Sequence, residues 1–472
     1  MFEPVIAPSG TLLGLLQRGR GDGTLHALTA PRDEALTALT HCVLSDPRRD
    51  WQVENRSLYY ARLYLDLHGG LGAVERHLFD PDDALDTDEA RTGLALSVLG
   101  HLASYGRRDA LVLLRRYAER GANWAWALDE LALRDDDAGL RALARPVLAR
   151  FPADPEGGAA LAAAVRDAYE PRPWRLWEDD PREDVRARVR AAREAGSFDR
   201  WQRQLRTRGP RPEWSVEAVL DWAQQGLEHG TVLHAPAARC LTAVAQPEDR
   251  PRIVAAAADG SDGARCTALR YLADAHDPQA LALIEAAAAA PSATVAEAAV
   301  ASFERMRSVA AVEHARRWAA RPDALGAAAA RVLALRGAAA DSPLVLAALR
   351  ETVRGQGPDA PTLDVLVDGT ARLGITAAAP VLRHVYRETA SSHLRGRTAR
   401  ALAATDPCFA RSLAVECLWD CEESTREVAA RHAETGDARV VERLRRLAAD
   451  PAEEAEVQTA VRSRIVPEPP GA

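Results

Sequence analysis

Lysine is missing from this sequence of 472 residues, in which all 60 basic residues are arginine. The Walker A loop, the ATP-binding lysine of protein kinases, Schiff-base enzymes and Ser-x-x-Lys hydrolases each need an ammonium group for their chemistry. The composition therefore excludes these four classes of enzyme. An alanine-rich chain that uses arginine alone is also typical of GC-rich bacterial genomes.

Cysteines and long apolar runs are scarce as well. Six cysteines in so long a chain do not form the disulfide framework of a small secreted domain. The longest apolar run, at 281–290, is interrupted by Glu285 and is shorter than the ~18 residues that a membrane-spanning helix needs. Glu3 and Pro4 stand where a signal peptide carries positive charge. We therefore expect a cytoplasmic protein that does not contact a membrane.

The charge balance points the same way. The formal net charge is −8 and the pI is about 5.9, which argues against general coating of nucleic acid or of an anionic membrane. With 47% apolar residues the chain can bury a large core.

Helical periodicity dominates the pattern, and alternating β-branched residues are rare. Leu363, Leu366 and Leu373, for example, fall on one helical face. Such stripes run for 10–15 residues before Gly, Pro or Asp interrupts them. Asp-Pro, a helix N-cap acceptor followed by a first-turn proline, begins at Asp46, Asp80, Asp154, Asp180, Asp277, Asp406 and Asp450. The pattern predicts short helices joined by short turns.

The turns recur at a nearly constant interval. Turns at Gly374, Asp406 and Gly436 are 32 and 30 residues apart, and 263–290 holds two apolar helical stripes around the turn Ala-His-Asp-Pro. This series, clearest over 231–466, resembles the HEAT-repeat family, in particular the short units of phycobilisome-lyase-type HEAT proteins. The resemblance implies an all-α fold, an α-solenoid of stacked antiparallel helix pairs in a HEAT-like superhelix. An irregular helical bundle is the alternative.

The two halves of the chain differ in composition. Of 24 aromatic residues, 18 precede residue 231. We expect an irregular, Trp-rich helical domain at 1–206, a regular Ala-rich HEAT-repeat solenoid at 213–466 and a disordered tail at 467–472. The glycine-rich stretch 19–23 is interpreted as a flexible connector, because it does not fit G-x-G-x-x-G and no strand precedes it.

Two enzyme classes with HEAT-type folds find little support in the residues. Deoxyhypusine hydroxylase ligates iron through His-Glu pairs, and no histidine here is followed by Glu. Cys417 and Cys421 lack a second ligand pair at zinc-finger spacing. Phycobilin lyases share the repeat type, but a fold alone does not carry a function. We predict no catalytic, metal-binding or cofactor-binding residues and no cofactor, and whether the chain is an enzyme stays open.

Three clusters are candidates for binding a partner. The first, Arg56, Tyr60 and Tyr64, shares a helical face and either packs within a repeat or faces a ligand. The second, Trp124 and Asp129 together with Trp126, invites comparison with HEAT-like DNA glycosylases, which hold a damaged nucleotide with tryptophans and an aspartate; core packing is the alternative.

The third cluster lies in 182–211, where ten arginines meet four acidic residues. Arg186, Arg190, Arg193 and Trp201 would suit phosphates and bases, or an acidic protein surface. The alternatives are a solvated helix face with ion pairs along the helix, or pairing with acidic loops of the same chain.

Since no catalytic constellation stands out, the best prediction is a non-enzymatic HEAT-repeat scaffold that binds a macromolecular partner, a protein by preference, on its concave face. The first alternative is a nucleic-acid-binding HEAT-like protein related to the DNA glycosylases. The second, which we disfavour, is a metal-dependent HEAT enzyme.

Overall fold

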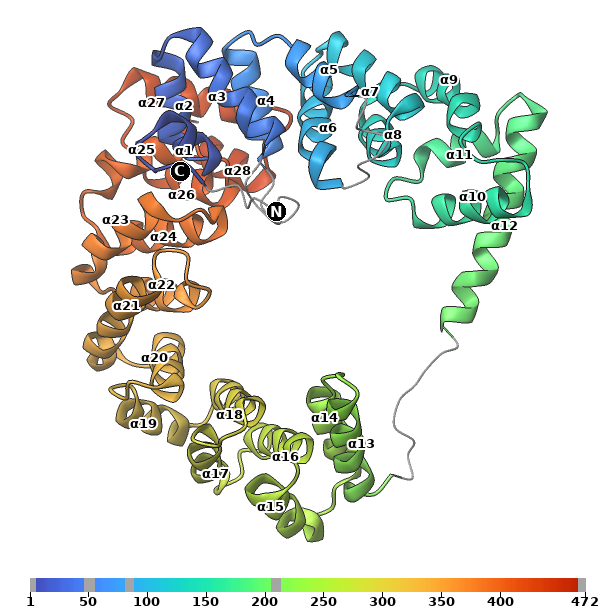
Figure 1. The fold of residues 1–472 in the computed structure, drawn as a ribbon. Coiled ribbons are helices and arrows are strands. Elements are labelled where there is room, and N and C mark those ends of the chain that lie inside the picture. Colours follow the sequence, from blue (N-terminus) through green and yellow to red (C-terminus); the bar gives the residue numbers. More distant parts are fainter. Residues whose placement is uncertain (1–5, 46–55, 81–88, 205–213, 466–472) are drawn as a thin grey trace, which may run out of the picture. The chain divides into compact units, whose positions relative to one another are not determined.

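The computed structural model describes residues 6–45, 56–80, 89–204 and 214–465. Within these ranges every regular element is a helix, and the 28 α-helices are short (Figure 1). The expected all-α fold class is confirmed. No helix in these ranges is both long enough and apolar enough to cross a membrane.

The backbone divides into two compact units. The first consists of Met1–Thr207, Arg387–Ala399 and Cys408–Ala472. Its N-terminal part contains α1 (Leu12–Gln17), α2 (Gly21–Thr29), α3 (Arg32–Leu44), α4 (Ser57–Asp66), α5 (Gly72–Leu78), α6 (Glu89–Ser104), α7 (Arg108–Arg120), α8 (Trp124–Arg134), α9 (Asp137–Leu148), α10 (Pro155–Asp167), α11 (Arg172–Glu178) and α12 (Glu183–Gln204). Its C-terminal part contains η5 (Phe409–Arg411), α25 (Leu413–Cys417), α26 (Glu423–His432), α27 (Ala438–Ala449) and α28 (Ala455–Ile465).

The second unit consists of Arg208–Tyr386 and Arg400–Pro407. It contains α13 (Val216–Glu228), α14 (His234–Val244), η2 (Pro247–Asp249), α15 (Arg250–Asp259), α16 (Asp262–Asp274), α17 (Ala280–Ala288), α18 (Ala293–Arg305), α19 (Val309–Trp318), α20 (Ala324–Arg336), η3 (Ala339–Asp341), α21 (Ser342–Gln356), α22 (Leu363–Arg372) and η4 (Thr376–Ala378). Helices α23 (Ala379–Glu388) and α24 (Ser392–Thr405) have residues in both units.

Helices of the second unit stack in sequence order. Helices α16, α18, α20 and α22 each pack on the next, and α15, α17, α19 and α21 each pack beside their following neighbour. Helix α20 buries eight residues, whereas α21 buries only Val345 and Leu349. Small alanine side chains let the stacked helices approach one another closely, and the stacking buries apolar surface that one helix pair could not bury alone. This packing is consistent with an α-solenoid.

Arginine guanidinium groups join stacked helices by binding the C-terminal ends of neighbouring helices. Arg372 donates to the backbone oxygens of Leu333, Ala334 and Gly337 at 3.0, 2.9 and 2.8 Å. The last carbonyls of a helix have no intrahelical partner, and the planar guanidinium fork reaches several of them at once. The arginine-only composition thus has a structural use in this fold.

Several turn aspartates pair with an arginine of an earlier helix. Asp154 caps α10 by accepting from Gly157 N at 2.7 Å, as the Asp-Pro pattern predicts. Asp277 and Asp406, however, pair with Arg250 and Arg383 at 2.6 Å. At these two turns the carboxylate therefore links helices that are separate in the sequence.

In the first unit, the N-terminal helices pack directly against C-terminal ones. Cys421 N donates to Gly19 O at 2.9 Å, and α2 contacts α25. Gly19 has φ +67°, and a Cβ there would lie 2.4 Å from Cys421 Sγ; a Cβ at Gly21 would lie 1.9 Å from Glu416 O. The interpretation of 19–23 as a flexible connector is therefore wrong: the stretch ends in helix α2, and its glycines permit a close approach.

Buried ion pairs accompany this contact. Arg20 meets Glu416 at 2.7 Å, and Arg395 meets Asp420 at 2.7 Å with both side chains fully buried. The described helices after residue 408 thus belong to the first compact unit. The expected division into 1–206 and 213–466 stays a prediction. Residues 207–212, between the two expected domains, and the expected tail at 467–472 lie outside the described residues.

Candidate functional site

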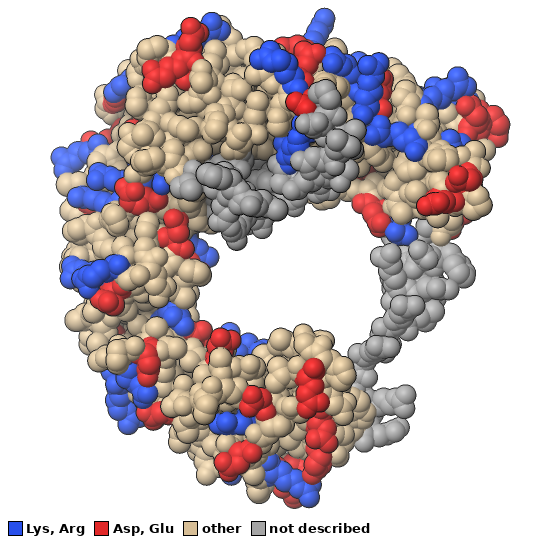
Figure 2. Space-filling view, in the orientation of Figure 1, with Lys and Arg blue, Asp and Glu red and all other residues tan. Residues whose placement is uncertain are grey.

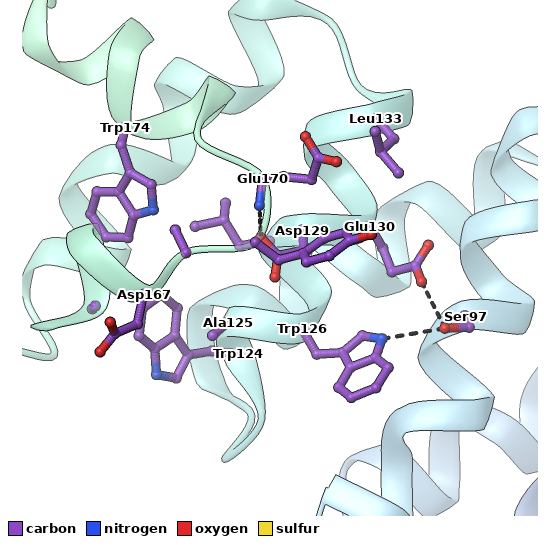
Figure 3. Close-up of a pocket in the computed structure, with 14 residues that line it drawn as sticks. Ser97, Trp124, Ala125, Trp126, Asp129, Glu130, Leu133, Asp167, Glu170 and Trp174 are labelled. Carbon is purple, nitrogen blue, oxygen red and sulfur yellow. Dashed lines mark hydrogen bonds between the residues drawn. The ribbon is translucent and has the colours of Figure 1, made fainter. Parts of the chain in front are cut away.

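A cavity of about 700 Å³ opens in the first unit between α8 and the segment that joins α10 to α11 (Figure 3). Ser97 of α6 contributes to one side. The described residues that line it are Ser97, Trp124, Ala125, Trp126, Leu128, Asp129, Glu130, Leu133, Ala164, Asp167, Ala168, Tyr169, Glu170 and Trp174. We call it the α8 cavity. Four of these residues are aromatic and four are acidic.

Edge-to-face contacts hold the tryptophans of the cavity in place. The Trp124 ring lies 6.4 Å from that of Trp174 and 5.7 Å from that of Phe151, and Trp174 lies 4.9 Å from the buried Trp177. Such pairs restrict the rings beyond what burial alone achieves. Phe151 and Trp177, which do not line the cavity, therefore hold Trp124 and Trp174 in position.

A hydrogen-bonded chain orients the other side of the cavity. Trp126 Nε1 donates to Ser97 Oγ at 3.2 Å, and Ser97 Oγ donates to Glu130 Oε1 at 2.7 Å (Figure 3). Arg134, one turn further along α8, pairs with Glu130 at 2.6 Å. Burial raises the pKa of Glu130, and the Arg134 guanidinium opposes that shift. The charge of Glu130 is thus already compensated within the protein.

Asp129 is held differently. Its Oδ1 accepts a hydrogen bond from the backbone N–H of Glu170 at 3.0 Å. Burial, together with the neighbouring Glu170 and Glu130 carboxylates, raises the pKa of Asp129 from its usual 3.8 to about 6. In the described part of the chain, no arginine or histidine forms an ion pair with Asp129 or Glu170. A perturbed carboxyl in a cavity is typical of a functional site.

The rim of the cavity is apolar and exposed. Tyr169 is 83% exposed and Leu133 is 59% exposed. They are two of the seven large hydrophobic side chains that the described residues leave exposed. Asp167, also at the cavity, pairs with Arg166 at 2.7 Å. The site thus combines an acidic, aromatic interior with an apolar entrance.

The second predicted cluster falls in this site. Trp124, Trp126 and Asp129 all line the cavity, although the prediction rested on sequence proximity alone. Glu170 and Tyr169 were not predicted, because they follow α10, some 40 residues later. Glu130 stands four residues after Trp126, on the same helical face, and that spacing could have indicated it.

The first predicted cluster lies in the interior. Arg56, Tyr60 and Tyr64 are at most 1% exposed. Tyr60 Oη donates to Leu16 O at 3.0 Å, and Arg56 Nη2 donates to Ala390 O at 2.7 Å. These contacts correct the prediction of a partner-facing strip: the three side chains pack helices together and present no surface.

The described arginines of the third cluster bind acidic groups and carbonyls of the same unit. Arg186 pairs with Glu183 and donates to Asp180 O at 2.8 Å. Arg190 meets Asp179 at 3.3 Å, and Arg193 pairs with Glu178. The side chain of Trp201 lies outside the described residues. On the face that Figure 2 shows, arginines and acidic residues are interspersed.

No group of three or more His, Cys, Asp or Glu side chains in the described ranges is arranged to hold a metal ion. Searches of family models, curated proteins and solved structures find no match to this sequence.

Proposed function

We propose that this chain is a binding protein whose α8 cavity and its rim dock a partner protein. The observation that carries the proposal is the pair of exposed apolar side chains, Tyr169 and Leu133, at the entrance of a cavity with rigid aromatic walls. Exposed apolar groups around a pocket mark interaction sites, and aromatic residues dominate the binding energy of protein interfaces.

The repeat architecture supports the same proposal. Stacked helix pairs offer extended surfaces to partners. The turn spacing of about 30 residues, with the sequential packing of α16, α18, α20 and α22, supports membership of the HEAT-repeat family, in its short phycobilisome-lyase-type form. That family assignment is part of this proposal.

Nucleic-acid binding is the second candidate. It is favoured by the meeting of Trp124, Trp126 and Asp129 in one cavity, which is the feature that invites comparison with HEAT-like DNA glycosylases. The lining carboxylates count against it, because phosphates approaching the cavity would be repelled. The arginines of α12 offer little compensation, since those described already bind Glu178, Asp179 and Glu183.

Site-specific photocrosslinking tests the proposal. The photoreactive residue p-benzoylphenylalanine replaces Tyr169 in one protein and Val309, a 76% exposed residue of α19, in a control. Both proteins are irradiated in lysate of the native host. We expect one protein, identified by mass spectrometry, to crosslink at position 169 but not at 309.

Binding of that purified protein is then measured against two variants. Tyr169→Ala should weaken it by about tenfold or more, whereas Val309→Ala should leave it unchanged. Equal crosslinking at both positions, or an affinity that Tyr169→Ala does not alter, would contradict the proposal. Salt-sensitive binding of DNA that Tyr169→Ala abolishes would favour the second candidate.

A further inference from the structure

We propose that the α8 cavity receives a basic side chain, an arginine or lysine of the partner protein, with Asp129 as its counter-charge. This inference rests on the proposed function and specifies which side chain of the partner the α8 cavity binds.

The charges of the lining are of one sign. Asp129, Glu130, Asp167 and Glu170 line the cavity, and no arginine or histidine is among the described lining residues. Arg134 and Arg166 compensate two of the four, Glu130 and Asp167. Asp129 and Glu170 remain, joined by the hydrogen bond from Glu170 N to Asp129 Oδ1. An incoming cation would meet these two carboxylates.

The aromatic groups suit the same ligand. Trp124 and Trp126 of α8 and Trp174 of α11 line the same cavity as Asp129 (Figure 3). A guanidinium or ammonium group is attracted to the face of a tryptophan, and more so where water is excluded. Arginine and lysine also carry an aliphatic stem, which Leu128 and Ala168 could cover.

The size of the cavity and its rim favour a side chain that belongs to a protein. A volume of about 700 Å³ lies within the range of ligand pockets. Tyr169 and Leu133 at the entrance would contact the residues that flank the basic side chain. A free small cation would leave both exposed, so the rim argues for a peptide segment.

Ionisation of Asp129 also destabilises the folded protein. The carboxylate lies in a partly buried, acidic setting without a cation of its own. A positively charged ligand relieves this unfavourable field when it binds, which is the arrangement expected of a binding site.

Blocked amino acids test the chemistry directly. The probes are N-acetyl-arginine amide, N-acetyl-lysine amide and N-acetyl-citrulline amide, the last being an uncharged analogue of arginine. Binding is followed by the indole N–H signals in NMR spectra of protein with ¹⁵N-labelled tryptophan. Replacement of Trp124, Trp126 and Trp174 by Phe, one at a time, assigns the three signals.

We expect saturable shifts of these three signals with the two cationic probes and at least about tenfold weaker binding of the citrulline probe. Asp129→Asn keeps the acceptor for Glu170 N–H but removes the charge, and it should weaken the cationic probes by about tenfold or more. Glu297→Gln, an exposed carboxylate on α18, is the matched control and should change nothing.

The outcomes separate this inference from the proposed function. If the citrulline and arginine probes bind equally, or if no probe binds, the inference that the cavity receives a basic side chain is wrong. The proposed docking of a partner protein would then still be supported by crosslinking at position 169. If the cationic probes bind but no protein crosslinks there, the proposed function fails, and with it the assignment of the cation to a protein. The inference is supported when Asp129→Asn weakens both the probes and the crosslinked partner.

Discussion

Asp129 and Glu170, 41 residues apart, meet through a hydrogen bond of 3.0 Å from the Glu170 backbone N–H to the Asp129 carboxylate. The bond ties the segment after α10 to helix α8 and closes one side of the cavity. Because it involves a backbone donor, an asparagine at position 129 can still accept it. The charge of Asp129 can therefore be tested separately from the geometry.

Asp129→Asn should raise the melting temperature at pH 7.5 and raise it by a smaller amount at pH 5. The pKa of Asp129 is about 6 in the folded protein and near 3.8 in the unfolded chain. The folded state therefore binds the carboxyl proton more tightly. Stability from this group is therefore lost as pH rises from about 4 to about 6. Thermal unfolding followed by circular dichroism at both pH values measures the difference, with Glu297→Gln as the control. A lower melting temperature at pH 7.5 would show that the charge is stabilising.

Binding of the arginine probe should weaken as pH falls below about 6. Protonation of Asp129 neutralises the negative charge that attracts the cation. Glu130 and Glu170 line the same cavity, and burial raises the pKa of Glu130 as well. The NMR titration repeated at pH 7.5 and pH 5 checks this. An affinity that does not change with pH would show that Asp129 is not the counter-charge of the bound cation.

His101 should make the protein sensitive to acid. Burial, together with the guanidinium groups of Arg134 and Arg62, lowers the pKa of His101 to about 4. The unfolded chain then binds more protons between about pH 6.5 and pH 4, so stability falls as pH drops through that window. The loss is on the order of 3 kcal/mol for this shift. His101→Gln should flatten the decline in melting temperature across that range; an unchanged decline would assign the acid sensitivity to other groups.

Gly19→Ala should destabilise the protein more than Gly374→Ala does. Both glycines have positive φ, +67° and +63°, so both variants bear a backbone cost of roughly 1 kcal/mol. A Cβ at position 374 meets open space, whereas one at 19 collides with Cys421 Sγ. We expect a further loss of about 1–3 kcal/mol for Gly19→Ala, measured by urea unfolding. Equal losses would mean that Gly19 does not approach Cys421 so closely.

Replacing Arg186, Arg190 and Arg193 together by Gln should lower the melting temperature slightly. Each pairs with an acidic side chain or carbonyl of its own unit at an exposed position, and such pairs contribute ~0–1 kcal/mol. Binding of the crosslinked partner should not change. Weaker binding with a smaller salt dependence would instead assign these arginines to a polyanionic partner.

The sequence by itself determined that the chain forms short helices joined by short turns. Helical periodicity, turn residues such as Asp154 with Pro155, and the recurrence near 30 residues act over a few turns of chain, so they can be read without knowing the fold. The turn predicted within 263–290 separates α16, ending at Asp274, from α17, starting at Ala280. These local preferences sufficed for the all-α class.

Only the tertiary structure decided which of the candidate residues share a site. Tyr60 and Trp124 were both candidates from their spacing, but stacking of the helices buries Tyr60 and leaves Trp124 beside a cavity. The contact of Gly19 with Cys421 joins positions 402 residues apart in number, and no local pattern predicts it. Contacts of this kind depend on how the helices pack in three dimensions, because side chains far apart in the sequence meet only once their helices have docked.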